Sequence, residues 1–503
     1  MLRENEEVMY KSTRDQISVF DDATNFIGAK LSPTNRWVRM SATIPWDLID
    51  EKYEATFKTL NVGQPALSAR MAIGTLIIRE KQKISDEETL EQILDSPYLQ
   101  WFIGLTEFTD KAPFDRSSIT YFRKRVTPEI LAEVNDYITG RKKIKRDDDD
   151  DESKGEKPTE QKTEVVEDDA CENKGTLIVD ASCVPADIKY PTDVNLLNES
   201  REKLENMILN LHRQIGTGRK APKVYKKAAR KAYLRFAKNR KPKKSEIRKA
   251  IKKQLGYVRR NLKIMTSLIA EGGLLTKAQE QELKTITTVS EQQEQMYREK
   301  THTIENRIVS LHQNWVRPIV RGKTNASVEF GAKVTISLVG GYSFVEKIGW
   351  EAYNEGTELI DIIENYKAKT GVYPERVLVD KIFRTRTNLQ YCKEKGIRLN
   401  GPKLGRPPAD KNEYRAQCQL EREEAKERNA IEGKFGEGKR RYYLEQTKTR
   451  LKETTETQIH LTFLVMNLSK KLRISLRLIL KAIENSIFEQ LYKRKSLMTT
   501  AFA

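Results

Sequence analysis

The sequence predicts an α/β fold, a mixed sheet that is interrupted by a helical insertion and preceded by an all-helical N-terminal domain. Two short apolar runs, Thr176–Asp180 and Arg376–Asp380, each end in an aspartate. An apolar run of that length is typical of a buried strand. A long segment of helical character separates the two runs, and a polar helix that carries Glu432 follows the second.

Composition limits the possible classes of protein. The 503 residues suggest about three domains, at roughly 150 residues each. No stretch approaches the ~20 consecutive apolar residues of a membrane span, and residues 1–7 lack the apolar core of a signal peptide. The net charge of +19 favours a polyanionic partner. We therefore expect a cytoplasmic nucleic-acid-binding protein with no membrane partner, the alternative being a merely solvated basic protein.

Several kinds of chemistry are poorly supported by the sequence. The four cysteines form no Cys-x-x-Cys pair, so a disulfide framework or a zinc ribbon is not expected, and we interpret them as reduced thiols. The four histidines form no His-Glu-x-x-His motif, and no Gly-x-Ser-x-Gly sequence is present. A Walker phosphate loop is also absent. Histidine-based hydrolysis and ATP use are therefore not indicated.

Residues 1–140 are predicted to form a helical domain for DNA binding or assembly. An apolar helix is expected at 66–78, and Ser85 followed by Glu88 is a helix-capping signal. The segment 117–125 combines aromatic residues with Arg123, Lys124 and Arg125. Such a helix could lie along a DNA backbone or groove. A surface helix with its aromatic side chains in the core explains the pattern equally well.

Residues 141–173 are predicted to be a charged, flexible linker. A basic run at 141–146 is followed by five aspartates, Asp147–Asp151. Blocks of like charge repel each other and rarely fold. We assign the aspartates no catalytic role. At the other end of the chain, residues 471–503 are expected to form a helical tail.

Residues 197–318 are predicted to be a basic helical insertion with two matching apolar stripes. Both stripes have the one-sided spacing of a packed helix, i, i+4, i+7, i+11. The stripes are Leu204, Ile208, Leu211 and Ile215, and Ile304, Ile308, Leu311 and Trp315. We expect them to pair as an antiparallel stalk.

Between the stripes, residues 213–263 hold 21 lysines or arginines against one acid, Glu246. So large an imbalance would repel itself without a polyanion. We expect DNA contact, since cations on phosphates supply affinity that does not depend on sequence. The candidate contacts are Lys226, Lys227, Arg230 and Lys231. A solvated basic helix, or a contact with an acidic surface of another subunit, remains open.

The predicted element order along the chain is β, insertion, β, β, α, β, α, β, α. The sheet resumes at 332–339, and Gly340-Gly341 is a turn signal before a hairpin partner. Helices are expected at about 355–370, 385–395 and from about 410. This is an RNase H-like pattern that is interrupted after its first strand. The catalytic domain would comprise residues 174–196 plus 319–470.

Three carboxylates are candidates for catalysis. Open α/β sheets place their ligands at the carboxyl ends of their strands, where we expect Asp180 and Asp380. With Glu432 they could hold two divalent ions about 3.5–4 Å apart, which suits phosphodiester cleavage and joining. Mg²⁺ prefers carboxylate oxygens and needs no histidine. Arg428 and Lys439 lie near the face of Glu432 on the same helix, where they could hold a phosphate.

These residues resemble the signature of DDE transposases of bacterial insertion sequences. Arg428-x3-Glu432-x6-Lys439 matches the Arg-x3-Glu-x6-Lys part of it. The full signature has tyrosine three residues before the arginine, and here that position is Ala425. The resemblance covers about residues 40–135 and 175–470. Its other motifs are Phe114–Arg125, Val179–Ala181 with Pro185–Asp193, Asp380–Lys381, Gly401–Pro402 and Leu404–Pro407.

The resemblance implies a bacterial enzyme that works at the nucleoid. It would excise an element at its terminal inverted repeats and insert it into target DNA. Asp180, Asp380 and Glu432 would bind two Mg²⁺ ions, for which Mn²⁺ is expected to substitute. The partners would be double-stranded DNA, as element ends and target, and a second copy of the chain in a homodimeric complex. A structure-specific nuclease of the same fold and a catalytically inactive DNA-binding descendant are the alternatives.

Overall fold

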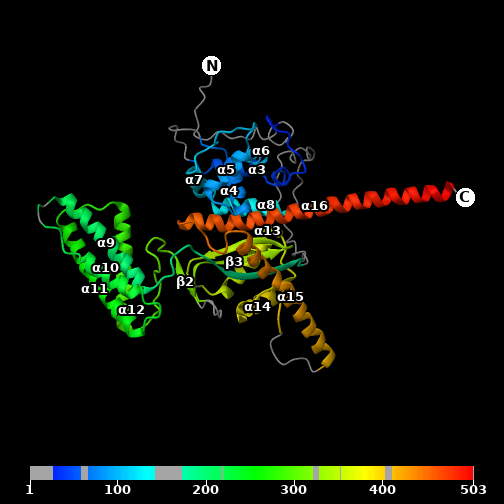
Figure 1. Cartoon of the computed structure of the whole chain (residues 1–503). Helices are drawn as coiled ribbons and strands as arrows, with labels where there is room; N and C mark the ends of the chain where they lie inside the picture. Colours follow the sequence, from blue (N-terminus) through cyan, green and yellow to red (C-terminus); the bar gives the residue numbers. More distant parts are fainter. Residues whose placement is uncertain are drawn as a thin grey trace, which may run out of the picture.

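The computed structural model has a mixed α/β fold, and the predicted fold class is confirmed at that level (Figure 1). The structure describes residues 26–57, 66–141, 173–216, 218, 220–320, 328–351, 353–402 and 410–501. The bulk of the predicted linker, 142–172, and the motif Leu404–Pro407 lie outside these ranges.

The sheet has six strands in the order β2-β3-β1-β5-β6, and β4 pairs with β3. β1 is antiparallel to β3 and parallel to β5, so the sheet is mixed as expected. The short strand β2, which pairs with the first residues of β3, was not predicted. The strands are β1 (Thr176–Pro185), β2 (Arg317–Val320), β3 (Val328–Val339), β4 (Tyr342–Gly349), β5 (Arg376–Leu378) and β6 (Arg398–Leu399).

Helices cover both faces of the sheet. On one face, Leu177 and Val179 of β1 pack with Ile363 of α13. On the other face, Ile178 shares a core with Ile431 of α15. This alternation along β1 follows from the two-residue period of a strand. The elements concerned are η3 (Glu355–Glu358), α13 (Leu359–Thr370), η4 (Lys381–Phe383), α14 (Arg386–Glu394), α15 (Lys411–Arg441) and α16 (Lys452–Ala501).

Residues 26–141 form helices in the regions that the structure describes. The apolar helix predicted at 66–78 is present as α4, and the Ser85 hydroxyl accepts a bond of 3.1 Å from the Glu88 N–H, which confirms the predicted cap. The helices are α2 (Arg36–Ser41), α3 (Trp46–Glu54), α4 (Ala69–Gln82), α5 (Asp86–Asp95), α6 (Pro97–Phe102), α7 (Ser118–Arg125) and α8 (Pro128–Thr139).

The N-terminal helices and the sheet share one hydrophobic core. α16 lies between them and contacts α2, α4, α7 and α8 as well as β4 (Figure 1). Residues 461–468 of this helix are all buried. A helix that is buried on every side is the mark of a core element rather than a surface helix. The segments before and after the charged linker are therefore held together by a helix from the C-terminal part of the chain.

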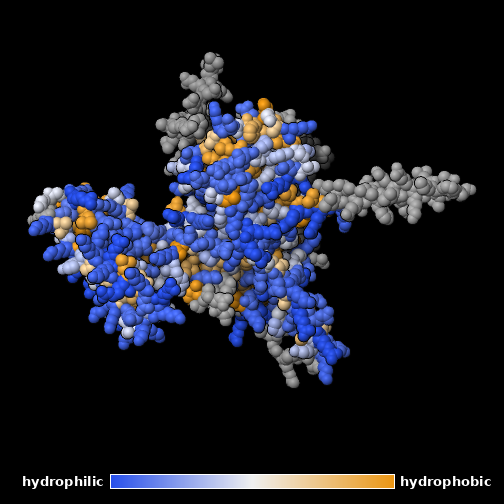
Figure 2. All heavy atoms as spheres, viewed as in Figure 1, coloured by the Kyte–Doolittle hydropathy of each residue, from blue (hydrophilic) through white to orange (hydrophobic). Residues whose placement is uncertain are grey.

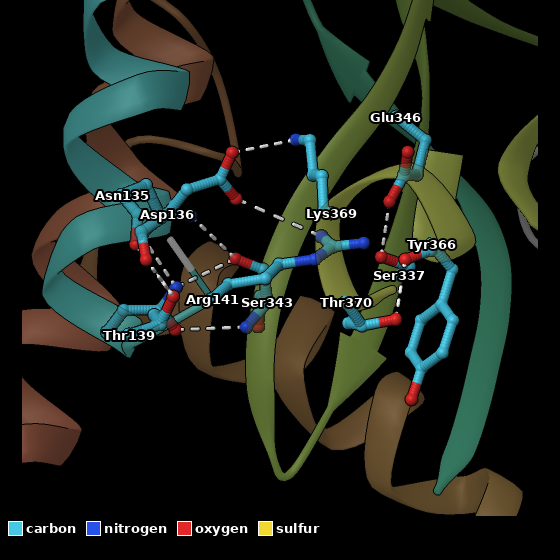
Figure 3. A network of polar contacts seen from close by, with 11 residues as sticks. Asn135, Asp136, Thr139, Arg141, Ser337, Ser343, Glu346, Tyr366, Lys369 and Thr370 are labelled. Carbon is cyan, nitrogen blue, oxygen red and sulfur yellow. Dashed lines mark hydrogen bonds and ion pairs between the residues drawn. The ribbon is translucent and has the colours of Figure 1, made fainter. Parts of the chain in front are cut away.

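Polar contacts reinforce this junction (Figure 3). Asp136 of α8 forms an ion pair of 2.8 Å with Lys369 of α13. The Asn135 side-chain amide donates to the Ser343 carbonyl of β4 over 3.2 Å. Next to them, the Arg141 guanidinium lies 4.3 Å from the centre of the Phe344 ring. These contacts attach the end of α8 to one end of the sheet.

The insertion forms its own hydrophobic core and projects to one side of the sheet (Figure 1). The first predicted stripe is confirmed, since Leu204, Ile208 and Leu211 are buried on α9. Its main packing partner is α11. The helices of the insertion are α9 (Asp193–Ile215), α10 (Lys226–Ala237), α11 (Lys244–Ala270) and α12 (Lys277–Glu299).

The second predicted stripe and the antiparallel stalk are wrong. α12 ends at Glu299, and residues 300–316 form turns and irregular structure. Lys300 and Asn306 have positive φ angles of 56° and 52°, which a continuing helix cannot accommodate. Ile308 and Leu311 are buried in the core of the insertion, whereas Trp315 packs against Trp350 beside the sheet. The apolar residues of this irregular segment pack into two separate cores, and their spacing in the sequence resembles that of a helix only by coincidence.

No helix in the described ranges is long and apolar enough to cross a membrane.

Candidate active site

Asp180 and Asp380 emerge side by side from neighbouring strands. The parallel pairing of β1 and β5 ends at Ile178 and Leu378, so each aspartate lies two residues beyond the last pair. Side chains alternate along a strand, so Asp180 and Asp380 are expected on the same face as Ile178 and Leu378, which is the face that α15 covers. The prediction that β1 ends at Asp180 is wrong, since antiparallel pairing with β3 continues to Pro185. β5, the parallel neighbour of β1, ends at Leu378. Beyond this point β1 has no strand on that side in the described ranges, and the two carboxylates lie at the edge that is left.

The backbone around Asp380 is fixed by a neighbouring side chain. Asn400 accepts a bond of 2.9 Å from the Val379 N–H and donates one of 3.0 Å to its carbonyl. The carboxylate of Asp380 then accepts a bond of 2.7 Å from the Lys381 N–H, which begins η4. Arg384 donates to the carbonyls of Asn400 and Pro402. The exposed carboxylate of Asp380 is thus held on a rigid turn.

Asp180 lies in a drier environment. Its side chain is 18% exposed, and one oxygen accepts a bond of 2.8 Å from the Ala181 N–H. The pKa of Asp180 is raised to about 6, mainly by burial and also by the charges of Glu355 and Asp380, while the Ala181 N–H and the Arg428 guanidinium oppose the shift. Ionising a buried carboxyl group costs free energy, and a nearby cation such as the Arg428 guanidinium offsets part of that cost.

Glu355 was missed by the sequence prediction. It begins η3 and forms an ion pair of 2.8 Å with Lys333 of β3. Its proximity to Asp180 arises because η3 packs against η4, where a Cβ on Gly356 would lie only 2.6 Å from the Ile382 carbonyl oxygen. No pattern in the sequence marks Glu355, because this approach depends on tertiary packing.

One face of α15 is fixed on the sheet. Arg376 of β5 binds Glu427 through two contacts, of 2.9 and 3.2 Å. Arg398 of β6 binds Glu424 at 3.0 Å. One and two turns further along, Ile431 and Phe435 enter the core. These positions, together with Arg428, form a continuous helical face, which sets the rotation of the helix about its axis.

Glu432 lies at the edge of that face and is paired with Arg428. The Arg428 guanidinium lies 3.0 Å from Glu432 and 4.0 Å from Asp180, and thus between two of the predicted ligands. The Glu432 side chain is 55% exposed. Among the described residues, no three acidic, histidine or cysteine side chains lie close enough to hold one metal ion. The two aspartates are brought together, and Glu432 remains on the far side of Arg428.

The other two signature positions lie on the same helix. Lys439 is half-buried near the end of α15, two turns after Glu432. Ala425, which replaces the tyrosine of the signature, is exposed.

The predicted DNA-contacting cations of the N-terminal part occupy three different environments. Arg123 is nearly buried and forms an ion pair with Asp86, so it is a structural residue of α7. Arg125 stacks on Phe57, with its guanidinium 3.9 Å from the ring centre. Lys124 is exposed and lies over the exposed ring of Tyr121. The alternative interpretation, with the aromatic side chains in the core, holds for Phe122, which is buried, but not for Tyr121, which is exposed.

The predicted cations of the insertion are on the surface. Lys226, Lys227, Arg230 and Lys231 are all exposed on α10. The visible face of the insertion is largely hydrophilic (Figure 2).

Two family models match the chain. Residues 377–469 match the family described as "Transposase DDE domain", and residues 25–125 match the one described as "Transposase domain (DUF772)". The first contains Asp380, Arg428, Glu432 and Lys439. The two matched segments are each similar to a transposase domain, and together they cover less than half of the chain. The resemblance predicted from the sequence is therefore confirmed. DDE domains generally use divalent metal ions.

A curated relative and the solved structures add less. An uncharacterized protein, ORF8 in the nfe locus of Rhizobium meliloti, is 34% identical over 108 residues. The match covers 22% of this chain and 51% of that relative, so the chain spans about half of the relative's length. No solved structure matches the chain.

The raised pKa of Asp180 predicts a stability change. A carboxyl group whose pKa is higher in the folded state than in the unfolded state lowers the free energy of unfolding as pH rises from about 4 to 6. Asp180→Asn removes this penalty. We expect the variant to exceed wild type near pH 7.5 by up to about 3 kcal/mol and to equal it near pH 4. Urea unfolding at both pH values measures this, with exposed Asp110→Asn as the control. A constant difference between wild type and variant would contradict it.

Proposed function

We propose that the chain is a transposase that cuts DNA at the ends of an insertion sequence and joins those ends to target DNA. The observation that carries the proposal is the adjacency of Asp180 and Asp380 at one sheet edge, facing the helix that bears the signature. The matched DDE domain includes three signature positions and the second aspartate. The net charge of +19 suits a DNA substrate.

The strand arrangement supports an RNase H-like catalytic domain. Apart from β2, the sheet runs β4-β3-β1-β5-β6, with antiparallel pairing up to β1 and parallel pairing beyond it. In this proposal, residues 174–196 and 319–470 form the catalytic domain and residues 197–318 the basic insertion. Residues 1–140 serve DNA binding or assembly, 141–173 form the linker, and 471–503 form the tail.

The donor set at the sheet edge fits a divalent ion in part. Two aspartates converge with the Arg428 guanidinium as a nearby counter-charge, and carboxylate oxygens are the ligands that Mg²⁺ prefers. We propose that Asp180, Asp380 and Glu432 hold Mg²⁺, with Mn²⁺ as a substitute. Glu432 joins the set only if its ion pair with Arg428 opens. Bound metal ions would activate the attacking oxygen and neutralise the leaving one.

The residues of the chain have distinct parts in this reaction. Cleavage replaces the bond between phosphorus and the 3′ oxygen by a bond to a water oxygen, and the 3′ oxygen leaves as a hydroxyl. This 3′-hydroxyl then attacks a target phosphorus, and the new bond replaces the bond to the target's own 3′ oxygen, which leaves as a hydroxyl. Arg428 is positioned to bind a phosphate beside Asp180, as is Lys439 further along α15. The ion pairs of α15 with β5 and β6 hold both cations relative to the aspartates. A homodimer would place two such sites on the two ends of one element.

Removing any one carboxylate should abolish cleavage. We expect Asp180→Ala, Asp380→Ala and Glu432→Ala each to lose Mg²⁺-dependent cutting of a duplex that carries the element end. Affinity for the duplex should persist, because it comes mainly from cations. Gel analysis of cleavage and anisotropy of a labelled duplex measure the two properties. Glu423→Ala, which removes an exposed carboxylate of the same helix that is bonded to Gln419, is the matched control. Normal cleavage by one of the three variants would exclude that residue.

Removing the signature cations should separate catalysis from binding. We expect Arg428→Ala and Lys439→Ala to slow cleavage or strand joining more than they weaken DNA binding, since each is proposed to touch one phosphate near the aspartates. Single-turnover rates at saturating protein, compared with dissociation constants, measure this. If both variants lose only general affinity, these cations belong to the basic surface.

Strand joining distinguishes the transposase from its alternatives. Incubation of pre-cut ends with a plasmid target should give joined products. Cutting without joining would identify a structure-specific nuclease, and binding without either reaction would identify an inactive descendant.

The basic insertion is proposed to bind DNA backbone away from the carboxylates. Replacing Lys226, Lys227, Arg230 and Lys231 by alanine should flatten the dependence of log affinity on log salt, by about 0.9 for each phosphate that no longer meets a cation. Base preference should change little, because binding to phosphates does not specify sequence. Titrations at several salt concentrations measure the slope. An unchanged slope with dissociation of the dimer would show that the insertion serves assembly instead.

A further inference from the structure

Two adjoining cavities lie between the N-terminal helices and the segment that joins α15 to α16. Each has a volume of about 490 Å³, and their linings share Ser85, Tyr443 and Lys448, so the two hollows adjoin; we refer to them together as the groove. One end is lined by Arg116 and Thr120 beside α7. The other end reaches Pro185, the last residue of β1.

The part of the groove beside α7 carries an excess of positive charge. Its lining contains the cations Arg79, Arg116, Arg123, Lys448 and Arg450, and the acids Asp86 and Glu87. Glu87 is paired with Arg116 at 3.1 Å. Asp86 is shared by Arg79 and Arg123, whose side chains are only 7% and 11% exposed. Two largely buried guanidinium groups on one carboxylate leave a positive charge that is poorly screened by solvent.

The exposed cations at the rim add to this excess. Lys448 and Arg450 lie on the segment before α16, and both are exposed. The structure pairs neither with a carboxylate among the described residues. The ring of Tyr443 forms part of the wall and lies 4.7 Å from the Arg79 guanidinium, which holds that arginine in place. Hydroxyl groups of Ser85, Thr120 and Thr449 supply further hydrogen-bonding capacity.

We propose that this groove binds the phosphodiester backbone of the DNA on its way from the carboxylates toward the N-terminal helices. The inference rests on the proposed function and deepens it. The groove begins at Pro185, five residues after Asp180, which is roughly 16 Å along an extended strand. A linear polyanion fits an elongated groove with cations on both walls, because successive phosphates meet successive cations.

Removal of the rim cations tests the groove without disturbing its core. In the full chain, Lys448→Ala with Arg450→Ala should weaken binding of a labelled duplex by about tenfold at low salt. The control is Lys393→Ala with Lys395→Ala, which removes the same charge from the exposed end of α14, and it should change affinity by about twofold at most. Binding is measured by anisotropy in EDTA, so that cleavage does not enter.

A second variant is expected to change the affinity for duplex DNA in the opposite direction. Asp86→Asn removes the carboxylate that Arg79 and Arg123 share and should tighten duplex binding several-fold, whereas mere structural damage would weaken it. A thermal unfolding curve shows that the variant is folded. Unchanged affinity in the Lys448/Arg450 variant, or weaker binding by a folded Asp86→Asn protein, would contradict the proposal that the groove binds DNA.

The failure of this proposal and that of the proposed function are distinguishable. If wild type cuts and joins DNA while the groove variants bind normally, only the groove is wrong. If the groove variants change affinity as expected while wild type neither cuts nor joins DNA, the groove proposal is supported and the proposed transposase function is contradicted.

Discussion

The burial of α16 between the N-terminal helices and the sheet is the interaction on which the rest of the structure depends. Its residues 461–468 contact solvent on no side, so the two layers that it joins lose their common core without it. The position of α15 depends on the same helix, because Phe435 packs against Phe463 of α16. The orientation of the signature helix over Asp180 is thus set from both sides, by ion pairs to β5 and β6 and by the apolar surface of α16.

The candidate active site combines rigid supports with unfavourable electrostatics. Asp380 is held by Asn400 and by the turn of η4, and α15 is held by Arg376 and Arg398. Asp180, in contrast, is partly buried next to other carboxylates, which raises its pKa. A group that destabilises the isolated fold is retained where function needs it. Arg428 offsets part of that cost by lying between Asp180 and Glu432.

Much of the fold could be predicted because local patterns agree with tertiary structure. The apolar runs before Asp180 and Asp380 are strands, and the helices at 359–370, 386–394 and 411–441 lie where the sequence predicts them. The irregular segment 300–316 could not be predicted, because its buried residues serve two separate cores. Nor could the place of Glu355, or the capture of Arg123 by Asp86, since both depend on packing between segments that are distant in the sequence. The metal-binding role of the three carboxylates stays a prediction.

The central position of α16 also affects the order of events during synthesis. A ribosome adds residues from the N-terminus, and domains generally fold as they emerge. Here the helix that completes the common core follows the N-terminal helices and the sheet strands in the chain. The end of α8 and the start of α16 are 313 residues apart, so at about 5–20 residues per second the N-terminal helices wait roughly 15 seconds to one minute for this partner. The edge that carries Asp180 and Asp380 therefore takes its final form only after α16 has been translated, and premature termination before Lys452 leaves two apolar layers without the element that covers them.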